Sequence, residues 1–101
     1  MLLAQVLGTV VSTRKDRALV GLKLLLTREL DGGFKPTGNY VVAADAVGAG
    51  ADEIVLLAQG SSARLTEVSR DKPVDAVIVG IVDAVEIDGK DVYLKRARAE
   101  R

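Results

Sequence analysis

The hydrophobic pattern of the chain consists of short apolar runs, each followed by a polar turn. Six runs are rich in Val, Leu and Ile, and they predict strands over residues 2–11, 19–28, 40–44, 54–58, 74–87 and 92–94. Glycine, proline and asparagine mark a hairpin-like loop over residues 31–39, and Asp88-Gly89 marks a tight turn. Many short strands separated by frequent turns are typical of an all-β protein, either a small barrel or a sandwich.

One short helix is expected between the fourth and fifth runs. It covers about Ser62 to Val68, and the side chain of Ser61 or Ser62 can cap its first amides. Pro73 blocks a longer continuation, because its ring fixes φ and it has no N–H to donate.

The fifth run is apolar on both of the faces that a strand presents. Successive side chains of a strand point to opposite faces, and here Ile78 and Val82 occupy one face while Val77 and Val79 occupy the other. A strand in a small monomeric barrel should keep one wet face, so this pattern predicts contact with another subunit. The alternative is a β-bulge at Gly80 that rotates the strand. The second run has a similar centre at residues 24–26.

Length and composition also favour self-association. The 101 residues suit one domain, residues 1–94, followed by a basic tail at residues 95–101. Hydrophobic residues make up 49% of the chain, yet only three residues are aromatic. A domain of this size buries only about 60–70% of its unfolded surface. We therefore expect another copy of the chain to cover part of the apolar surface.

The charge balance argues against nucleic acid as a partner. The formal net charge is zero, from 14 basic and 14 acidic residues, whereas nonspecific binding depends on neutralising phosphates. A small barrel that binds single strands would also need stacking aromatics and a basic groove. The tail alone is locally basic, and it is either a solvated terminus or a docking tail for an anion or a protein.

The sequence gives no sign of secretion or of a membrane anchor. Without Cys there is no mark of an oxidising compartment, so a cytoplasmic location is the default. Residues 1–15 lack the pattern of a signal peptide. The longest apolar stretch, residues 74–87, contains acidic residues and is shorter than the roughly 20 residues of a membrane span.

The glycine-rich segment 47–53 suggests phosphate binding but fits it poorly. Glu53 stands where G-x-G-x-x-G requires its third glycine, and the residues that follow predict a strand in place of a helix N-terminus. The structural alternative is that the glycines permit a turn with positive φ or the close approach of another backbone.

Catalysis and metal binding are not expected either. Ser61 and Ser62 have no His partner, because the chain has no His. Asp45, Asp52 and Glu53 could form a carboxylate cluster for Mg²⁺ or Ca²⁺, but their spacing matches no known loop. Asp75 and Asp83 lie in apolar surroundings, where a carboxylate more often accepts backbone hydrogen bonds or pairs with Arg. We expect no enzyme activity, no cofactor and no metal.

Three blocks in order, residues 8–26, 43–64 and 73–83, resemble the EutN/CcmL family, the pentameric vertex proteins of bacterial microcompartments. The joint pattern D-x-x-G-A-G-x-x-E-x-V-L-x-x-x-G-S-S-A-R carries the resemblance. It implies a small OB-like β-barrel that assembles as a cyclic homopentamer. It also implies a structural function: the ring caps the five-fold vertices of a shell whose facets are hexameric proteins. Whether the shell is a carboxysome or a metabolosome stays open.

The resemblance also implies roles for small and charged residues in the ring. Small residues would let loops approach a neighbour closely, and Arg64 could form a bidentate pair with Asp45, Glu53 or Asp75, within or across subunits. The region 61–64 is predicted nearer the axial opening than the loop 31–39, and the segment 12–17 and the tail are candidates for hexamer contacts. The residues predicted at a subunit interface or axial loop are Asp45, Gly48, Gly50, Glu53, Gly60, Ser61, Ser62, Arg64, Asp75 and Asp83.

Two other hypotheses stay open on the sequence alone. One is an OB-type binding module for nucleic acid or protein. The other is a small carboxylate-dependent enzyme built on Asp45, Asp52 and Glu53.

Overall fold

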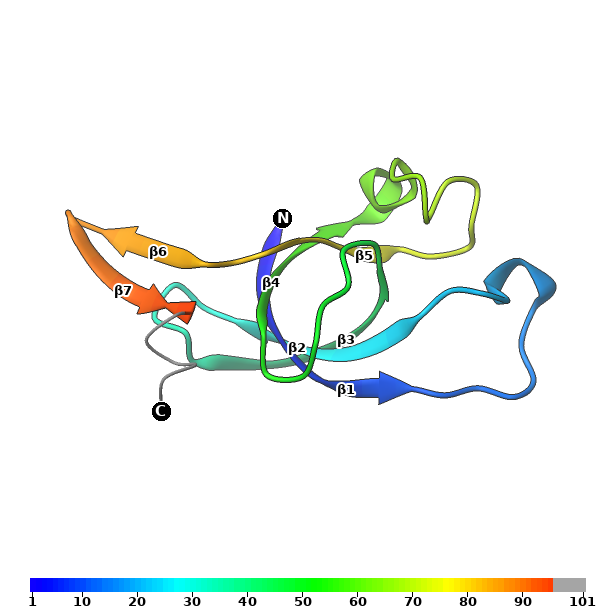
Figure 1. The fold of residues 1–101 in the computed structure, drawn as a ribbon, viewed down its shortest axis with the longest axis horizontal. Coiled ribbons are helices and arrows are strands. Elements are labelled where there is room, and N and C mark those ends of the chain that lie inside the picture. Colours follow the sequence, from blue (N-terminus) through cyan, green and yellow to red (C-terminus); the bar gives the residue numbers. More distant parts are fainter. Residues whose placement is uncertain (96–101) are drawn as a thin grey trace.

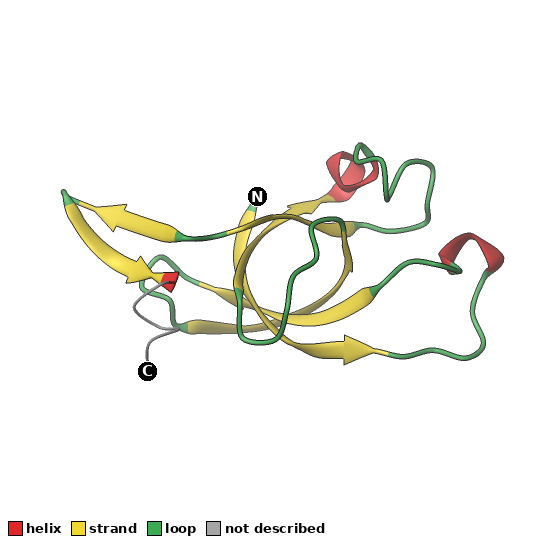
Figure 2. Ribbon diagram, in the orientation of Figure 1, coloured by secondary structure: helices red, strands yellow, loops and turns green. Residues whose placement is uncertain are grey.

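The computed structural model describes residues 1–95, and apart from Lys95 the predicted basic tail lies outside this range. The fold is almost entirely β-structure (Figures 1 and 2). The strands are β1 (Leu2–Val10), β2 (Leu24–Leu30), β3 (Pro36–Asp45), β4 (Ile54–Gln59), β5 (Ala76–Ile81), β6 (Ala84–Ile87) and β7 (Lys90–Leu94). Two 3₁₀ helices, η1 (Arg17–Leu19) and η2 (Gly60–Arg64), lie in the connections. The all-β prediction is confirmed.

The first five strands close into a barrel in the order β1-β2-β3-β5-β4. Strand β1 is antiparallel to both β2 and β4, and the barrel closes through a short parallel contact between β3 and β5. Five strands in a Greek-key barrel are the arrangement of the OB-fold. The barrel predicted from the resemblance is therefore present.

The barrel interior is filled largely by small side chains. Four of the nine residues in its main core are alanines, which suits a barrel of only five strands because such a barrel is narrow. The nine are Ala4, Val6, Leu25, Ala43, Ala49, Val55, Leu57, Ala76 and Ile78. Ala49 comes from the loop 46–53, which crosses in front of the barrel in Figure 1. This loop is therefore part of the core.

The fifth apolar run is two strands, because β5 ends at Ile81 and β6 begins at Ala84. The register between β4 and β5 shifts so that Leu56 and Leu57 oppose Gly80 and Ile78. Val79 is thus the extra residue of a β-bulge. Val77, on the second face, is fully buried in a cluster with Ala58 and Ala63. A bulge at Gly80 was the alternative expected from the sequence, and the structure places the bulge one residue earlier, at Val79. Part of the second apolar face is also covered within the chain.

The second run also begins later than predicted. Strand β2 starts at Leu24, because the preceding residues form η1 and a turn at Gly21 with φ of 90°. The Asp16 carboxylate caps this 3₁₀ turn by accepting from the amide of Ala18 at 2.8 Å.

The prediction of a helix over residues 62–68 capped by Ser61 or Ser62 is wrong. The helical turn is η2, and its first amides receive no side-chain cap. The Ser62 hydroxyl instead donates to the carbonyl of Gln59. Farther on, the buried Ser69 hydroxyl donates to the carbonyl of Ala63, and the Ser69 amide donates to Thr66 Oγ1. Ser and Thr side chains that bond nearby backbone compete with helix formation, and here they favour an irregular loop.

Strands β6 and β7 form a separate hairpin that projects from one end of the barrel (Figure 1). Asp88 and Gly89 both have positive φ, 52° and 78°, as the predicted tight turn requires. The hairpin is anchored by Tyr93, whose ring stacks on Phe34 with 5.5 Å between centroids. The connections with η1 and η2 extend from the other end, so the molecule measures 45 × 27 × 25 Å.

Candidate subunit interface

The glycine-rich turn after β3 binds the carboxylate of its own Asp45. Oxygen Oδ1 accepts from the amides of Val47 and Gly48, each at 3.0 Å, and Oδ2 accepts from the amide of Ala49 at 3.0 Å. The Lys23 ammonium lies 3.9 Å from Oδ2, and the Asp45 side chain is almost fully buried. Gly48 has φ of 78°, a conformation that favours glycine. Successive amides of this kind form an anion nest, and this nest is already filled by the protein's own carboxylate.

Glu53 closes the base of the same loop. Its Oε1 accepts from the amide of Gly50 at 2.6 Å, and its Oε2 pairs with the Lys95 ammonium. The hydrogen bond from Lys95, together with the one from Gly50, lowers the pKa of Glu53, while the carboxylate raises the pKa of Lys95. The ion pair of Lys95 with Glu53 connects the end of β7 to the loop that covers the barrel, and the Lys95 amide continues the β6–β7 pairing by donating to the carbonyl of Asp83.

Arg64 forms no ion pair with its three candidate partners, Asp45, Glu53 and Asp75, among residues 1–95, and the alternative of a partner on the next subunit stays a prediction. Asp45 and Glu53 are engaged by Lys23 and Lys95. Of the predicted partners, Asp75 lies on the same groove as Arg64. That groove has a volume of about 530 Å³, and it is also lined by Gly60, whose amide donates to the Asp75 carbonyl at 2.9 Å.

The ten predicted site residues therefore fall in three places. Asp45, Gly48, Gly50 and Glu53 belong to the loop that covers the barrel, and they mainly hold that loop. Ser61, Ser62 and Arg64 are exposed around η2, with Gly60 and Asp75 beside them. Asp83 lies in the connection between β5 and β6, where its carbonyl accepts from the amide of Lys95, the residue that pairs with Glu53.

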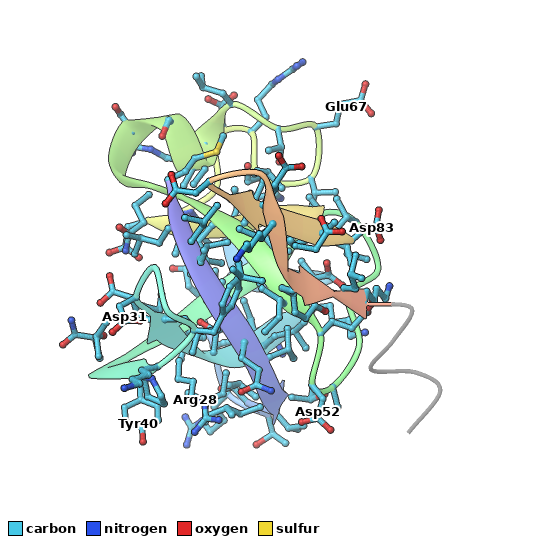
Figure 3. The ribbon with its side chains drawn as sticks, turned by 90° about the vertical axis from the view of Figure 1, so that its left-hand side faces the viewer. Arg28, Asp31, Tyr40, Asp52, Glu67 and Asp83 are labelled. Atoms are coloured by element: carbon cyan, nitrogen blue, oxygen red, sulfur yellow. The ribbon has the colours of Figure 1, made fainter. Side chains whose placement is uncertain are left out.

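The three acidic side chains considered for a carboxylate cluster, Asp45, Asp52 and Glu53, have separate environments in the described residues. No three acidic side chains come together as a metal site among residues 1–95. Asp52 is exposed in a turn with φ of 67° (Figure 3). No described helix has the length and apolar character to cross a membrane.

Sequence reasoning missed an apolar surface on β3. Twelve large hydrophobic side chains are exposed among residues 1–95, and two of them, Tyr40 and Val42, are neighbours on this strand. Tyr40 and Val42 are 65% and 47% exposed, whereas Ala43, the next residue along β3, is fully buried. Alternation along the third apolar run was the available signal, since Val41 and Ala43 share the core face.

Comparison with known proteins identifies the family. The model of the EutN_CcmL family, described as ethanolamine utilisation protein EutN/carboxysome, matches residues 1–83. The chain belongs to the EutN/CcmL family. The resemblance found in the sequence is thereby confirmed.

Relatives within the EutN/CcmL family match over nearly their whole length. The chain is 47% identical over 96 residues to the carboxysome shell vertex protein CcmL of Gloeobacter violaceus, covering 95% of this chain and 96% of that one. It is 44% identical over 95 residues to the microcompartment shell vertex protein EutN of Salmonella typhimurium, covering 94% and 96%.

Solved structures in the EutN/CcmL family share the fold. The Gloeobacter violaceus CcmL structure has a TM-score of 0.91 at 47% identity, covering 95% of this chain and 99% of that one. The pentameric microcompartment shell protein GrpN of Rhodospirillum rubrum has a TM-score of 0.74 at 47% identity, covering 86% and 98%.

Proposed function

We propose that this chain is a structural protein that assembles as a ring of five and caps the vertices of a bacterial microcompartment shell. The observation that carries the proposal is the match, over 95% of the chain and with a TM-score of 0.91, to a relative named a shell vertex protein. The pentameric state of the GrpN relative supports five as the number of subunits.

Geometry explains why such a shell needs a ring of five. A flat layer of hexagons cannot close on itself, and pentagons at its corners introduce the curvature that closes it. The partners proposed for this chain are therefore its own copies and the hexameric proteins of the facets. The neutral net charge gives no support to nucleic acid as a further partner.

Arg64 is proposed as a contact between subunits of the ring. It lines the groove of Gly60, Ser61 and Asp75 and forms no ion pair within residues 1–95. A bidentate pair with the carboxylate of Asp75 on the next copy would use the planar guanidinium fully. We also propose that the exposed turn around η2 lies nearer the ring axis than the loop 31–39.

The experiment is co-expression with a hexameric facet protein, followed by electron microscopy of the assemblies. With the chain present, closed polyhedral shells that contain it are expected. Without it, the hexamers should give open sheets, tubes or shells with missing corners. Equally closed shells in both preparations would contradict the proposed vertex function.

A further inference from the structure

We propose that the open edge and outer face of β3 at Tyr40 and Val42 form one half of the contact between neighbouring copies of the chain. This inference rests on the proposed ring, and it names the surface that makes it. Figure 3 shows Tyr40 at the margin of the molecule, beside Arg28 of β2.

The hydrogen-bond register shows which backbone groups of β3 face outward. The Asp45 amide donates to the Lys23 carbonyl at 2.9 Å, so these two residues form a hydrogen-bonded pair between antiparallel strands. Such pairs alternate with pairs whose N–H and C=O groups point away from the partner strand. Leu26↔Val42 and Arg28↔Tyr40 are pairs of this second kind. The backbone groups of Tyr40 and Val42 therefore point to the far edge of β3.

That far edge is covered for only part of its length. Strand β5 pairs with β3 at Ala44 and Asp45, and no other described strand pairs with this edge of β3. Unpaired strand edges invite pairing with another chain, and natural edges are commonly guarded by Pro, Lys or a bulge. Pro36 guards the start of β3, but the stretch from Tyr40 to Val42 contains none of these devices.

Side-chain hydrogen bonds also order the segment of β3 that precedes this edge. Glu29 on β2 accepts from the hydroxyl of Thr37 at 2.6 Å and from the side-chain amide of Asn39 at 2.9 Å. These bonds fix the segment that leads into Tyr40 against its neighbouring strand. An ordered edge loses less conformational entropy on docking than a flexible one.

The outer face at this edge offers apolar side chains next to one cation. Val42 lies opposite Leu26, and Tyr40 lies opposite Arg28. Farther along β3, Ala44 is already covered within the chain. A stable contact covers about 800 Å² on each partner, so the surface must extend from the edge across β2. In a closed ring every contact joins two different patches, and this surface is assigned as one of them.

Hydrogen exchange on the assembled wild-type protein tests the edge at single residues. The amides of Val41 and Ala43 face β2 and should be protected whether or not copies associate. The amides of Tyr40 and Val42 should be protected as well in the assembly, because the next copy covers them. Exchange of these two amides as fast as that of exposed loop amides would overturn the proposal.

Introducing a charged side chain at the edge of β3 tests the same surface, with the native mass of the protein as the measurement. Val42→Lys should give a folded monomer of 10.6 kDa while the wild type assembles. The matched control is Val20→Lys, which places the same charge on an exposed valine in the connection before β2 and should leave the assembly unchanged. Circular dichroism shows whether Val42→Lys folds, and if it does not, the exchange experiment decides.

The two proposals fail in different ways. A wild-type monomer would end the proposed ring. A wild-type pentamer together with a Val42→Lys pentamer would leave the ring intact and remove only the surface assigned here. Loss of assembly in both lysine variants would show that the edge has no special part in the contact.

Discussion

At the scale of a single residue, Asp45 stabilises the subunit by accepting hydrogen bonds from three backbone amides of the loop that covers the barrel. Asp45→Ala should lower the free energy of unfolding by about 3 kcal/mol, because removal of the carboxylate leaves buried donors without a partner. Urea unfolding at a fixed protein concentration measures the change.

Asp91 provides the matched control for that substitution, since it is an exposed aspartate on β7. Asp91→Ala should change the free energy of unfolding by no more than about 0.5 kcal/mol. Equal effects of the two substitutions would contradict the assigned role of Asp45.

Glu53 makes the stability of the loop depend on pH. The bonds from Lys95 and Gly50 lower the pKa of Glu53 below the ordinary value of 4.5. A carboxylate with a lowered folded pKa contributes stability that is present above the unfolded pKa and is lost as the pH falls through the folded one. Glu53→Gln should therefore lower the melting temperature at neutral pH, with a difference from wild type that shrinks below about pH 4.

Melting curves across this pH range measure the effect, with the exposed Glu86→Gln as the control. If the difference between wild type and Glu53→Gln stays constant from neutral to acidic pH, the ion pair with Lys95 contributes nothing to folding.

The sequence predicted the glycine-rich turn but did not predict that its amides bind the carboxylate of Asp45. The rejection of a nucleotide site agrees with the structure, where the amides bind Asp45. The Asp45 carboxylate binds the turn and makes no ion pair with Arg64 among residues 1–95. The turn that brings these amides to Asp45 includes Gly48, which has positive φ. The only available signal was an aspartate, Asp45, two residues before Val-Gly-Ala-Gly. Such a local pattern does not show whether the turn binds its own aspartate or an external anion.

At the scale of elements, the β6–β7 hairpin depends on its contact with the barrel. An isolated two-stranded hairpin is at best marginally stable in water, and Tyr93 anchors this one by stacking on Phe34. Tyr93→Ala should therefore speed amide exchange across β6 and β7 while the barrel strands keep their protection. Hydrogen exchange with mass spectrometry measures both regions at once.

Val92→Ala is the control, because Val92 is an exposed residue of the same strand. Faster exchange spread evenly over the barrel after Tyr93→Ala would show that the hairpin and barrel unfold as one unit.

The sequence predicted which apolar runs form strands more reliably than it predicted where they end. Residues 74–87 contain no proline, so one strand was the simple interpretation, with a bulge at Gly80 as the alternative. The position of the bulge at Val79 depends on the pairing of β5 with β4. Val77 is buried because Ala63 of η2 packs on it, a contact between residues far apart in the chain. The helix prediction failed because Thr66 and Ser69 bond nearby backbone and to each other.

At the scale of the whole molecule, the subunit leaves apolar surface for a neighbour. Its exposed hydrophobic side chains occur along the barrel, in the loops and on the hairpin. The aliphatic composition and the two-faced strands predicted this excess, and the family pattern predicted the barrel. The surface at Tyr40 and Val42 could not be derived from the composition or the family pattern. It depends on how much of β3 is covered by β5, which pairs with β3 only at Ala44 and Asp45.

The native mass of the purified chain, measured by native mass spectrometry, tests the ring most directly. Five chains of 10.6 kDa give 5 × 10.6 = 53 kDa, and a single species at that mass is the predicted result. A stable monomer at 10.6 kDa, or a dimer or hexamer in its place, would contradict the five-fold assembly on which the proposed vertex function depends.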